Sequence, residues 1–577
     1  MKILLVILSF LALQTSTYSS TSEDNKFNQK YLSNYFSALV SSGNQKNEAA
    51  LDYFNSSKFL IQKHDNFLKK YVFSLVLNGQ VKKGIDQIKI SKNDINSNTF
   101  ELNLLLLVDS FKKKDFKQAN KRIKEFQMDK DDGTYEYVIY KILKDFNYLF
   151  IKKEAIEDNK YGSLSLISTA FQNCYLNSQK TNSYFERLLN SSDGDYSRYM
   201  YFYFANLIEN KELKKVNEVS KRIEPLGESI LLHQIKDWID NEDYKKFKTH
   251  FSCKNENDIL AEIFYLVSNL FSTQNIFDQS NFYLRISEYL NPKFYFNRTL
   301  LAENYYLNKN NYQANKILED FKKKDKLYFW YKTKKIGRIL SEDNSEEEAA
   351  IYIKKYFNSI KSPTLKILYD YANINKGFEN YEIAIEYYTE LMKKVEKNSY
   401  ALSRILYRRG SSYERMGNYE KADKDMLESL KIYPNEPYTM NYLAYSWLER
   451  NHKIDEAIEM IQSAYKQKED DPYITDSVGW GYYLIGDYIN AEKYLKRALQ
   501  LMPDDPIVND HYGDVLWKLN KKLQANYYWR AVLELDETED KMKSKINYIA
   551  KDLFTIKYKP RILKAKKGKG SFKRKKK

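Results

Sequence analysis

Small and bulky apolar residues recur along the last third of the chain with a period of 34 or 35 residues. Sustained self-similarity at such a period is typical of repeat proteins. Two columns of small residues keep this spacing, namely Ala422, Ala457, Ala491 and Ala525, and Gly410, Ala444, Gly479 and Gly513. Two columns of bulky residues accompany them, namely Tyr413, Trp447, Tyr482 and Leu516, and Met426, Ile461, Leu495 and Trp529.

Within each unit of this period the pattern predicts two antiparallel helices. The small residues would let the two backbones approach closely, and the bulky ones would fill the volume beside them. Pro437, Pro472 and Pro506 each follow an acidic residue, which predicts a carboxylate-capped helix start. Each hairpin leaves an apolar face that only the next hairpin can cover, so the units should stack. The predicted fold is all-α, an α-solenoid of stacked antiparallel helix hairpins.

The same register continues upstream with less regularity. Ala384, Ala349, Ala314 and Ser280 keep the spacing, and so do Ala50, Gly84 and Ala119 near the N-terminus. Residues 135–260 are aromatic and helix-like but show no such column, so we interpret them as degenerate helical hairpins. The predicted organisation is a signal peptide (1–20), N-terminal repeat-like hairpins (21–134), the degenerate hairpins (135–260), divergent repeats (261–398), regular repeats (399–536), and a C-terminal helix remnant with a disordered basic tail (537–577).

The composition agrees with a folded helical protein of 577 residues. Hydrophobic residues make up 43% of the chain and aromatic residues 15%, while glycine (17) and proline (9) are scarce. A chain of this length and composition can bury a large interior and contains few helix breakers. The two cysteines, Cys174 and Cys253, form no ligand cluster, and we expect two semi-buried thiols, although a single disulfide stays open.

The two ends of the chain carry different signals. Lys2 precedes a largely apolar run from Ile3 to Leu13, followed by small polar residues, which predicts a secretory signal, with a buried first helix as the alternative. No cysteine near this run could take a lipid, and no later run is long enough to span a membrane. We therefore expect an exported, periplasmic protein that is soluble after signal cleavage.

The net charge of +16 resides mostly in a tail. Residues 557–577 hold twelve Lys and Arg and no acid, which leaves 16 − 12 = +4 for the rest of the chain. Such a tail could contact an anionic polymer or the membrane surface, or it could be a disordered solubilising segment. Nucleic acid is disfavoured, because only two aromatic residues are interleaved with these cations.

The stretch around Asp510, His511 and Asp514 is the strongest candidate for chemistry. A metal site would need ligands from several elements, and no second His or Cys cluster is visible. Two carboxylates on one helix do not by themselves make an acid/base pair. The sequence also lacks a phosphate-binding GxxxxGK[ST] loop, an HExxH motif and a GxSxG nucleophile turn. We therefore expect no enzyme activity and no cofactor.

The first helix of each hairpin is expected to line a concave groove. Positions 2, 5, 9 and 12 of each unit lie opposite its buried positions and would face that groove. Aromatic platforms flanked by carboxylates suit a protein or peptide partner. The alternatives are that Trp480 and Trp517 pack between hairpins and that the acids are merely solvated. The candidate groove residues are Arg404, Tyr407, Asn441, Tyr445, Asp476, Trp480, Tyr483, Asp510, Asp514 and Trp517, with Ser411 beside them.

The units 403–434, 471–503 and 505–535 resemble tetratricopeptide repeats, and 437–470 does so with one extra turn residue. The positions at which chaperone-binding repeats clamp a C-terminal carboxylate hold no lysine here, so acidic chaperone tails are not expected. The string from Asp476 to Leu533 is similar to the C-terminal block of exported bacterial repeat proteins, which include periplasmic lipoproteins that act as scaffolds for carboxyl-terminal processing proteases. The resemblance implies a non-catalytic scaffold or protease adaptor, with an assembly factor for an envelope or export machine as the alternative. The chain departs from that group in lacking the lipid-attachment cysteine and in adding the basic tail.

Overall fold

The computed structural model describes residues 29–62, 64, 66–91, 99–126, 128, 133–157, 160–343 and 345–535. The predicted signal peptide (1–20) and the C-terminal remnant with its basic tail (537–577, including 557–577) lie outside the described residues. Every regular secondary-structure element in the described part is a helix, which confirms the all-α prediction. The elements are α2 (Gln29–Gly43), α3 (Asn47–Asn55), η1 (Lys58–Gln62), α4 (Phe67–Leu77), α5 (Val81–Ser91), α6 (Phe100–Lys112), α7 (Phe116–Glu125), α8 (Tyr135–Lys152), α9 (Ser163–Tyr175), α10 (Thr181–Leu189), α11 (Tyr199–Glu209), α12 (Leu213–Ser220), α13 (Ile230–Asp240), α14 (Lys245–His250), α15 (Glu256–Thr273), α16 (Phe277–Leu290), η2 (Tyr295–Asn297), α17 (Arg298–Leu307), α18 (Asn311–Leu318), α19 (Lys326–Asp343), α20 (Glu346–Phe357), α21 (Leu365–Gly377), α22 (Tyr381–Met392), α23 (Tyr400–Arg415), α24 (Tyr419–Ile432), α25 (Pro437–Glu449), α26 (Ile454–Gln467), α27 (Pro472–Leu484), α28 (Tyr488–Leu501), α29 (Pro506–Lys518) and α30 (Lys522–Leu535).

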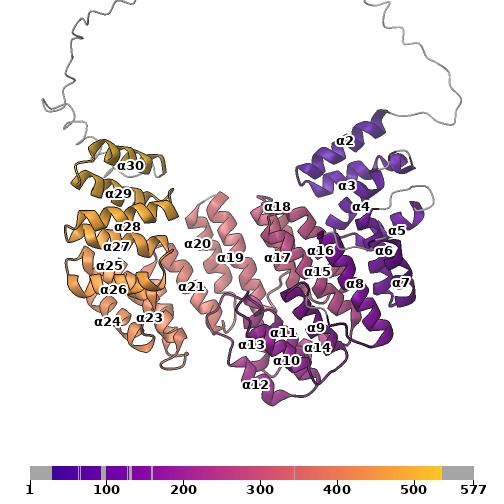
Figure 1. Ribbon diagram of the computed structural model, residues 1–577, viewed down its shortest axis with the longest axis horizontal. Helices are drawn as coiled ribbons and strands as arrows, with labels where there is room; N and C mark the ends of the chain where they lie inside the picture. The colour runs from indigo at the N-terminus through magenta and orange to yellow at the C-terminus, as the bar shows by residue number, and fades with distance from the viewer. Residues whose placement is uncertain are drawn as a thin grey trace, which may run out of the picture. The chain divides into compact units, whose positions relative to one another are not determined.

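The helices form two compact units (Figure 1). The first unit comprises Met1–Ile223 and Gly227–Tyr356, and the second comprises Glu224–Leu226 and Phe357–Lys577. In both units, consecutive helices pair as hairpins, for example α15 with α16 and α27 with α28.

The column of small residues marks the second helix of these hairpins. Its members from α3, α7, α16, α18, α20, α22, α24, α26, α28 and α30 are all at most 1% exposed. A small side chain at this position lets the second helix lie close against the first. The 34-residue register read from the sequence therefore corresponds to the observed helix pairs. The residues in question are Ala50, Ala119, Ser280, Ala314, Ala349, Ala384, Ala422, Ala457, Ala491 and Ala525.

The first unit is held together by contacts between helices that are far apart in the sequence. The hairpin α15–α16 packs against α4, α5 and α6, and one continuous hydrophobic core runs from Leu68 to Ile339. Phe73 and Phe282 stack across this contact with ring centroids 5.0 Å apart. Residues 135–260 form the long helix α8, the shorter helices α9–α14 and the start of α15; among them α9 pairs with α10 and α11 with α12. Two helix pairs thus form in this region without the repeated sequence pattern, and its interpretation as degenerate hairpins stays a prediction.

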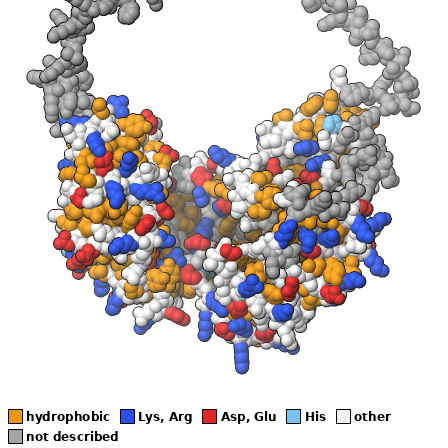
Figure 2. Space-filling view, in the orientation of Figure 1, with side chains coloured by type: hydrophobic (Ala, Val, Ile, Leu, Met, Phe, Trp, Pro, Cys, Tyr) orange, Lys and Arg blue, Asp and Glu red, His pale blue; other side chains and the backbone are white. Residues whose placement is uncertain are grey.

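The second unit is a stack of hairpins that follow one another in chain order (Figure 1). Each first helix contacts the first helix of the next hairpin, from α23 through α25 and α27 to α29. The cores are small and local, such as the one around Trp447 and Ile461 and the one around Leu516 and Trp529. Figure 2 shows hydrophobic side chains interspersed with charged ones on the visible face of α25–α30. This regular stack presents the residues that were predicted to form a groove.

Candidate partner-binding surface

Two aspartates fix where the first helices of the last two hairpins begin. Asp471 Oδ1 accepts hydrogen bonds from the backbone N–H groups of Tyr473 and Ile474, both at 3.0 Å. Asp505 does the same for Ile507 and Val508 at 2.9 and 3.0 Å. Proline occupies the first helical turn in both cases. The predicted role of these acids as helix caps is confirmed.

Glycines set how closely the paired helices approach. A Cβ atom added at Gly479 would lie 2.6 Å from Leu495 Cγ and 2.9 Å from the Leu495 backbone nitrogen. One added at Gly513 would lie 2.4 Å from Trp529 Nε1. At Gly410 the nearest backbone atom, the carbonyl oxygen of Ala422, would be 3.1 Å away. Real Cβ atoms essentially never approach within 3.0 Å, so the helix spacing at Gly479 and Gly513 depends on the missing side chains, and the approach at Gly410 is tight.

Aromatic side chains recur along the first helices α23, α25 and α27. We call Tyr407, Tyr442, Tyr445, Trp480 and Tyr483 the aromatic strip. Tyr407 and Tyr442 pack edge to face with centroids 5.9 Å apart, and Trp480 stacks on Tyr483 at 4.6 Å. All five are half-buried rather than enclosed in a core. They can therefore offer rigid apolar faces to another molecule.

Acidic residues hold this strip in place. Tyr442 donates its hydroxyl hydrogen to Glu414 Oε2 at 2.9 Å, and the Trp480 indole N–H donates to Glu449. Burial raises the pKa of Tyr483 to about 12, and the nearby charges of Asp514 and Asp510 add to the effect. The phenol of Tyr483 thus stays neutral at physiological pH and keeps its hydroxyl hydrogen, as does that of Tyr442, which donates to Glu414.

A buried ion pair joins the last two hairpins beneath Trp480. His511 Nδ1 lies 2.9 Å from Asp476 Oδ2, and the residues are 7% and 6% exposed. The imidazole stacks on the Trp480 ring at 4.0 Å. Burial acts to lower the pKa of His511, but the charge and hydrogen bond of Asp476, helped by Asp510 and Asp514, raise the pKa above its ordinary value. Asp476 is therefore a structural partner of His511, not a free carboxylate facing a groove.

The remaining predicted groove residues divide between surface and packing. Asp514 Oδ1 accepts the Trp529 indole N–H at 3.1 Å, and Asp510 is half-buried on the same helix. Trp517 packs against Trp529 with centroids 5.7 Å apart, and the Lys522 ammonium lies 4.6 Å from its ring centre. Both tryptophans at issue thus make packing contacts, Trp480 between hairpins and Trp517 within one.

A cavity opens at the other end of the strip, between α21, α23 and α25. Its volume is about 510 Å³. Arg404 and Tyr407, both predicted groove residues, line this cavity. Asn441, also a predicted groove residue, is not part of the lining, and its side-chain oxygen on α25 is buried without a hydrogen-bond partner. Its full lining is Tyr369, Tyr400, Ser403, Arg404, Tyr407, Arg408, Glu436, Tyr438 and Thr439.

Two features of this surface were not predicted, although the 34-residue repeat and the helical turn both indicate them. Asp476 and His511 are 35 residues apart, one repeat, so they occupy neighbouring positions on stacked first helices. Arg408 lies one helical turn after Arg404 and therefore shares its face. Comparing each position with those one repeat and one turn away would have identified both.

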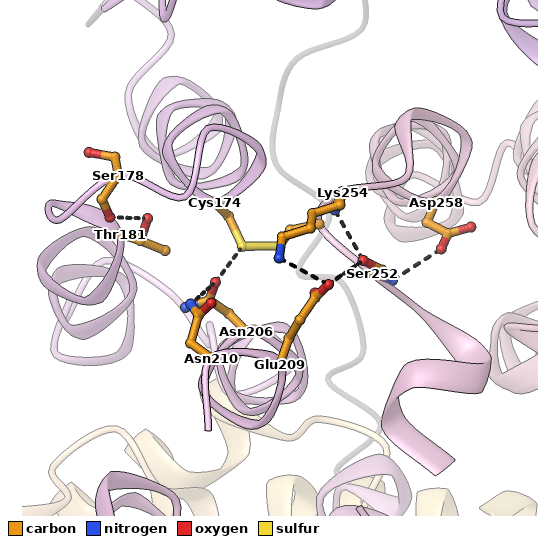
Figure 3. The surroundings of a disulfide bond; sticks show 10 residues. Cys174, Ser178, Thr181, Asn206, Glu209, Asn210, Ser252, Lys254 and Asp258 are labelled. Atoms are coloured by element: carbon orange, nitrogen blue, oxygen red, sulfur yellow. Dashed lines mark hydrogen bonds and ion pairs between the residues drawn. A yellow bond between two sulfur atoms is a disulfide. The ribbon is translucent and has the colours of Figure 1, made fainter. Parts of the chain in front are cut away.

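The cysteines form a disulfide in the first unit, which corrects the expectation of two semi-buried thiols (Figure 3). Cys174 on α9 bonds Cys253, which precedes α15, across a separation of 79 residues. Both are at most 2% exposed. Ser252 and Lys254 on either side of Cys253 both contact Glu209 of α11 (Figure 3). The pairing was hidden because it depends on how the irregular helices α9–α14 fold back, which no repeat column indicates.

The described residues provide no group of three or more His, Cys, Asp and Glu side chains arranged to hold a metal ion. Within the same part of the chain, no helix has both the length and the apolarity required for a membrane crossing.

Comparisons with known proteins find similarity to parts of this chain. Residues 403–436 match the family model described as tetratricopeptide repeat. TPR repeat-containing protein PA4667 of Pseudomonas aeruginosa is 34% identical over 110 residues, which cover 19% of this chain and 18% of that protein. Protein O-mannosyl-transferase TMTC1 of Homo sapiens is 27% identical over 129 residues, which cover 22% of this chain and 14% of that protein. A solved tetratricopeptide repeat protein from Parabacteroides merdae aligns with a TM-score of 0.37 and 15% identity over 44% of this chain and 98% of that one.

The stacked hairpins and their repeat period define the class: an α-solenoid. The family-model match shows that residues 403–436 of this solenoid are a tetratricopeptide repeat. The matched segments span less than a fifth of the curated relatives' lengths. Tetratricopeptide repeat proteins generally bind other proteins as scaffolds and are generally non-catalytic.

Proposed function

We propose that the protein is a non-catalytic scaffold that binds a partner protein along the aromatic strip of its second unit. The observation that carries this proposal is the recurrence of half-exposed aromatic side chains on the first helices of three successive hairpins. Tyr and Trp give a large contact area with few rotatable bonds, and they dominate the energetics of many interfaces. Half-exposed acids such as Asp510 would set the register of a partner segment.

We further propose that the protein works in the bacterial cell envelope. Its N-terminal pattern of Lys2 and an apolar run is that of a secretory signal. The buried disulfide between Cys174 and Cys253 supports the same location, because disulfides form and persist in oxidising compartments. Among envelope partners, a carboxyl-terminal processing protease is the one that the sequence resemblance suggests, and an assembly machine is the alternative.

The experiment that tests the scaffold role is an affinity purification from the native envelope fraction with the full chain. Replacing Tyr445 and Trp480 by alanine removes two central members of the strip. Loss of anchors of this kind weakens binding by about 2 kcal/mol or more each, roughly 30-fold. The variant should therefore lose a specific protein that the wild type retains.

The matched control is Tyr527→Ala, which removes an aromatic side chain that is 68% exposed on α30, outside the strip. This variant should retain the partner. Circular dichroism checks that all three proteins are equally folded. Retention of the same proteins by the Tyr445/Trp480 variant would show that the strip is not the binding surface.

A further inference from the structure

The cavity between α21, α23 and α25 has aromatic walls and a cationic interior. Four tyrosines line it, and two arginines, Arg404 and Arg408, project from one face of α23. The Arg404 guanidinium carbon lies 5.5 Å from the ring centre of Tyr369, and that of Arg408 lies 5.6 Å from Tyr407. Flat apolar walls around fixed positive charges suit a ligand that is anionic at one end and apolar beside it.

Arg408 lacks a counter-charge among the described residues. It forms no ion pair with a carboxylate, although neighbouring side chains bury much of it. Leaving a partly buried cation without an anion is unfavourable, so a site of this kind is stabilised by an anionic ligand.

The hydroxyl of Tyr369 supports the same conclusion. Tyr369 is 2% exposed, and its hydroxyl has no hydrogen-bond partner of normal geometry. The guanidinium of Arg408 beside it can only donate, so it cannot accept the phenol hydrogen. Buried polar groups are almost always satisfied, and this one needs an acceptor.

A third cation lies close by. Lys376 lies in the last turn of α21, and burial together with the charges of Arg408 and Arg415 lowers the pKa of Lys376 to about 8. The positive charges around the cavity therefore destabilise one another.

The acids near the cavity are already engaged. Glu436 Oε2 accepts the backbone N–H of Thr439 at 2.6 Å and so caps α25. Glu224, which groups with the second unit, accepts a hydrogen bond from Arg404 Nη1 at 3.2 Å. Neither acid contacts Arg408, which stays the free cation of the cavity within the described part of the chain.

We propose that this cavity receives an acidic side chain of the partner's bound segment, with a neighbouring aromatic or aliphatic side chain against the tyrosine walls. This rests on the scaffold function proposed above and assigns the chemistry that one end of the surface recognises. A side chain fits better than a C-terminal carboxylate, because the lining contains no Asn or Gln to hold the terminal backbone. Ser403 is also engaged, by Ser429 at 2.9 Å.

The test selects phage-displayed random peptides on the full chain and counter-selects them on Arg408→Met. Enriched peptides should contain Asp or Glu next to an aromatic or aliphatic residue. Synthetic copies of these peptides are prepared with the acidic residue and with its amide form, Glu→Gln or Asp→Asn. The affinity of each form for the wild type and for Arg408→Met is then measured by fluorescence anisotropy, which gives four values. Each single change should weaken binding about tenfold, and the double change should add little more, because both remove one charge-assisted contact.

Controls separate this contact from other effects. Arg530→Met, on α30, should bind as the wild type does, and Arg408→Lys should recover part of the affinity because it restores the charge. A peptide amidated at its C-terminus should bind as well as the free acid. Equal circular dichroism spectra establish that the variants are folded.

Three results would overturn the proposal: binding that is unchanged in Arg408→Met, binding that depends on the free C-terminus but not on the acidic side chain, and failure of the wild type to enrich any acidic peptide. The affinity purification with the Tyr445/Trp480 variant does not involve Arg408. It therefore decides separately whether the scaffold function holds.

Discussion

The two units bury their hydrophobic side chains in different ways. In the second unit the cores are small and join neighbouring hairpins, and each contains glycine or alanine positions that repeat every 34 or 35 residues. In the first unit one core extends over many helices and is completed by contacts across long stretches of sequence. A buried Arg198–Glu262 pair, 2.7 Å apart and separated by 64 residues, contrasts with the Arg409–Asp425 pair, which spans only 16 residues within one hairpin.

This difference shows what repetition contributes to a solenoid. Where every interface between hairpins is the same, a short sequence pattern is sufficient to specify the packing. The free energy of unfolding is then close to a sum of the contributions of the repeats and of the interfaces between neighbours. Where helices vary in length, as in α9–α14, individual long-range contacts must replace the pattern. The first unit should therefore be sensitive to the loss of single long-range links, and the second to changes in its repeated small residues.

The largest effect is expected from removing the disulfide. Replacing Cys174 and Cys253 by alanine frees a loop of 79 residues in the unfolded chain. Cross-links that close loops of this size contribute about 4 kcal/mol to the free energy of unfolding. Peptide-resolved hydrogen exchange of the full chain should show faster exchange in α9–α15 and little change in α23–α30.

Reduction of the wild type with dithiothreitol provides the control. It should reproduce the effect of the double substitution and should leave the double variant unchanged. Equal loss of protection in α23–α30 would contradict the view that the link serves the first unit alone.

A smaller effect is expected from filling one close approach in the second unit. Gly479→Ala places a methyl group 2.6 Å from Leu495 Cγ and 2.9 Å from the backbone of the facing helix, which cannot move away freely. Overpacking of this kind lowers the free energy of unfolding by about 1–3 kcal/mol. Hydrogen exchange should accelerate in α27–α30 and not in the first unit.

Gly377→Ala is the matched control, because a Cβ at this helical glycine would meet nothing within 4 Å. It should leave stability unchanged or raise it by up to about 1 kcal/mol, since alanine has less freedom in the unfolded chain. If both substitutions had the same effect, the close approach at Gly479 would not be what sets the helix spacing.

The helix pairs of the regular repeats could be predicted from the sequence because their packing is encoded locally. Ala491, Gly479 and Leu495 lie within one hairpin, so their spacing alone implies the contact. The same register also identifies most residues of the aromatic strip. It did not show that Asp476 is buried, because that depends on which side chain the next hairpin places against it.

Features created by several hairpins or by irregular helices were beyond this reasoning. The cavity needs Tyr369 from α21, Arg408 from α23 and Tyr438 from α25, and a one-dimensional pattern does not show the empty space between them. The Cys174–Cys253 bond was equally hidden, because the 79 intervening residues carry no periodic signal.

The smallest effect concerns pH and tests how the last two hairpins are joined. The pKa of His511 is raised in the folded state, so its pairing with Asp476 stabilises the protein fully below the unfolded pKa of about 6.5. That stabilisation is lost as the pH rises through the folded pKa. Hydrogen exchange of the α27–α30 amides can be measured at increasing urea concentrations and corrected for the pH dependence of intrinsic exchange. The free energy of unfolding obtained in this way should therefore be lower at alkaline pH than near pH 6. Asp476→Asn removes the charge and leaves burial dominant, so His511 should then resist protonation and the trend should reverse, with stability falling as the pH drops. An unchanged trend in Asp476→Asn would mean that other groups cause it and that the ion pair is not what couples these hairpins.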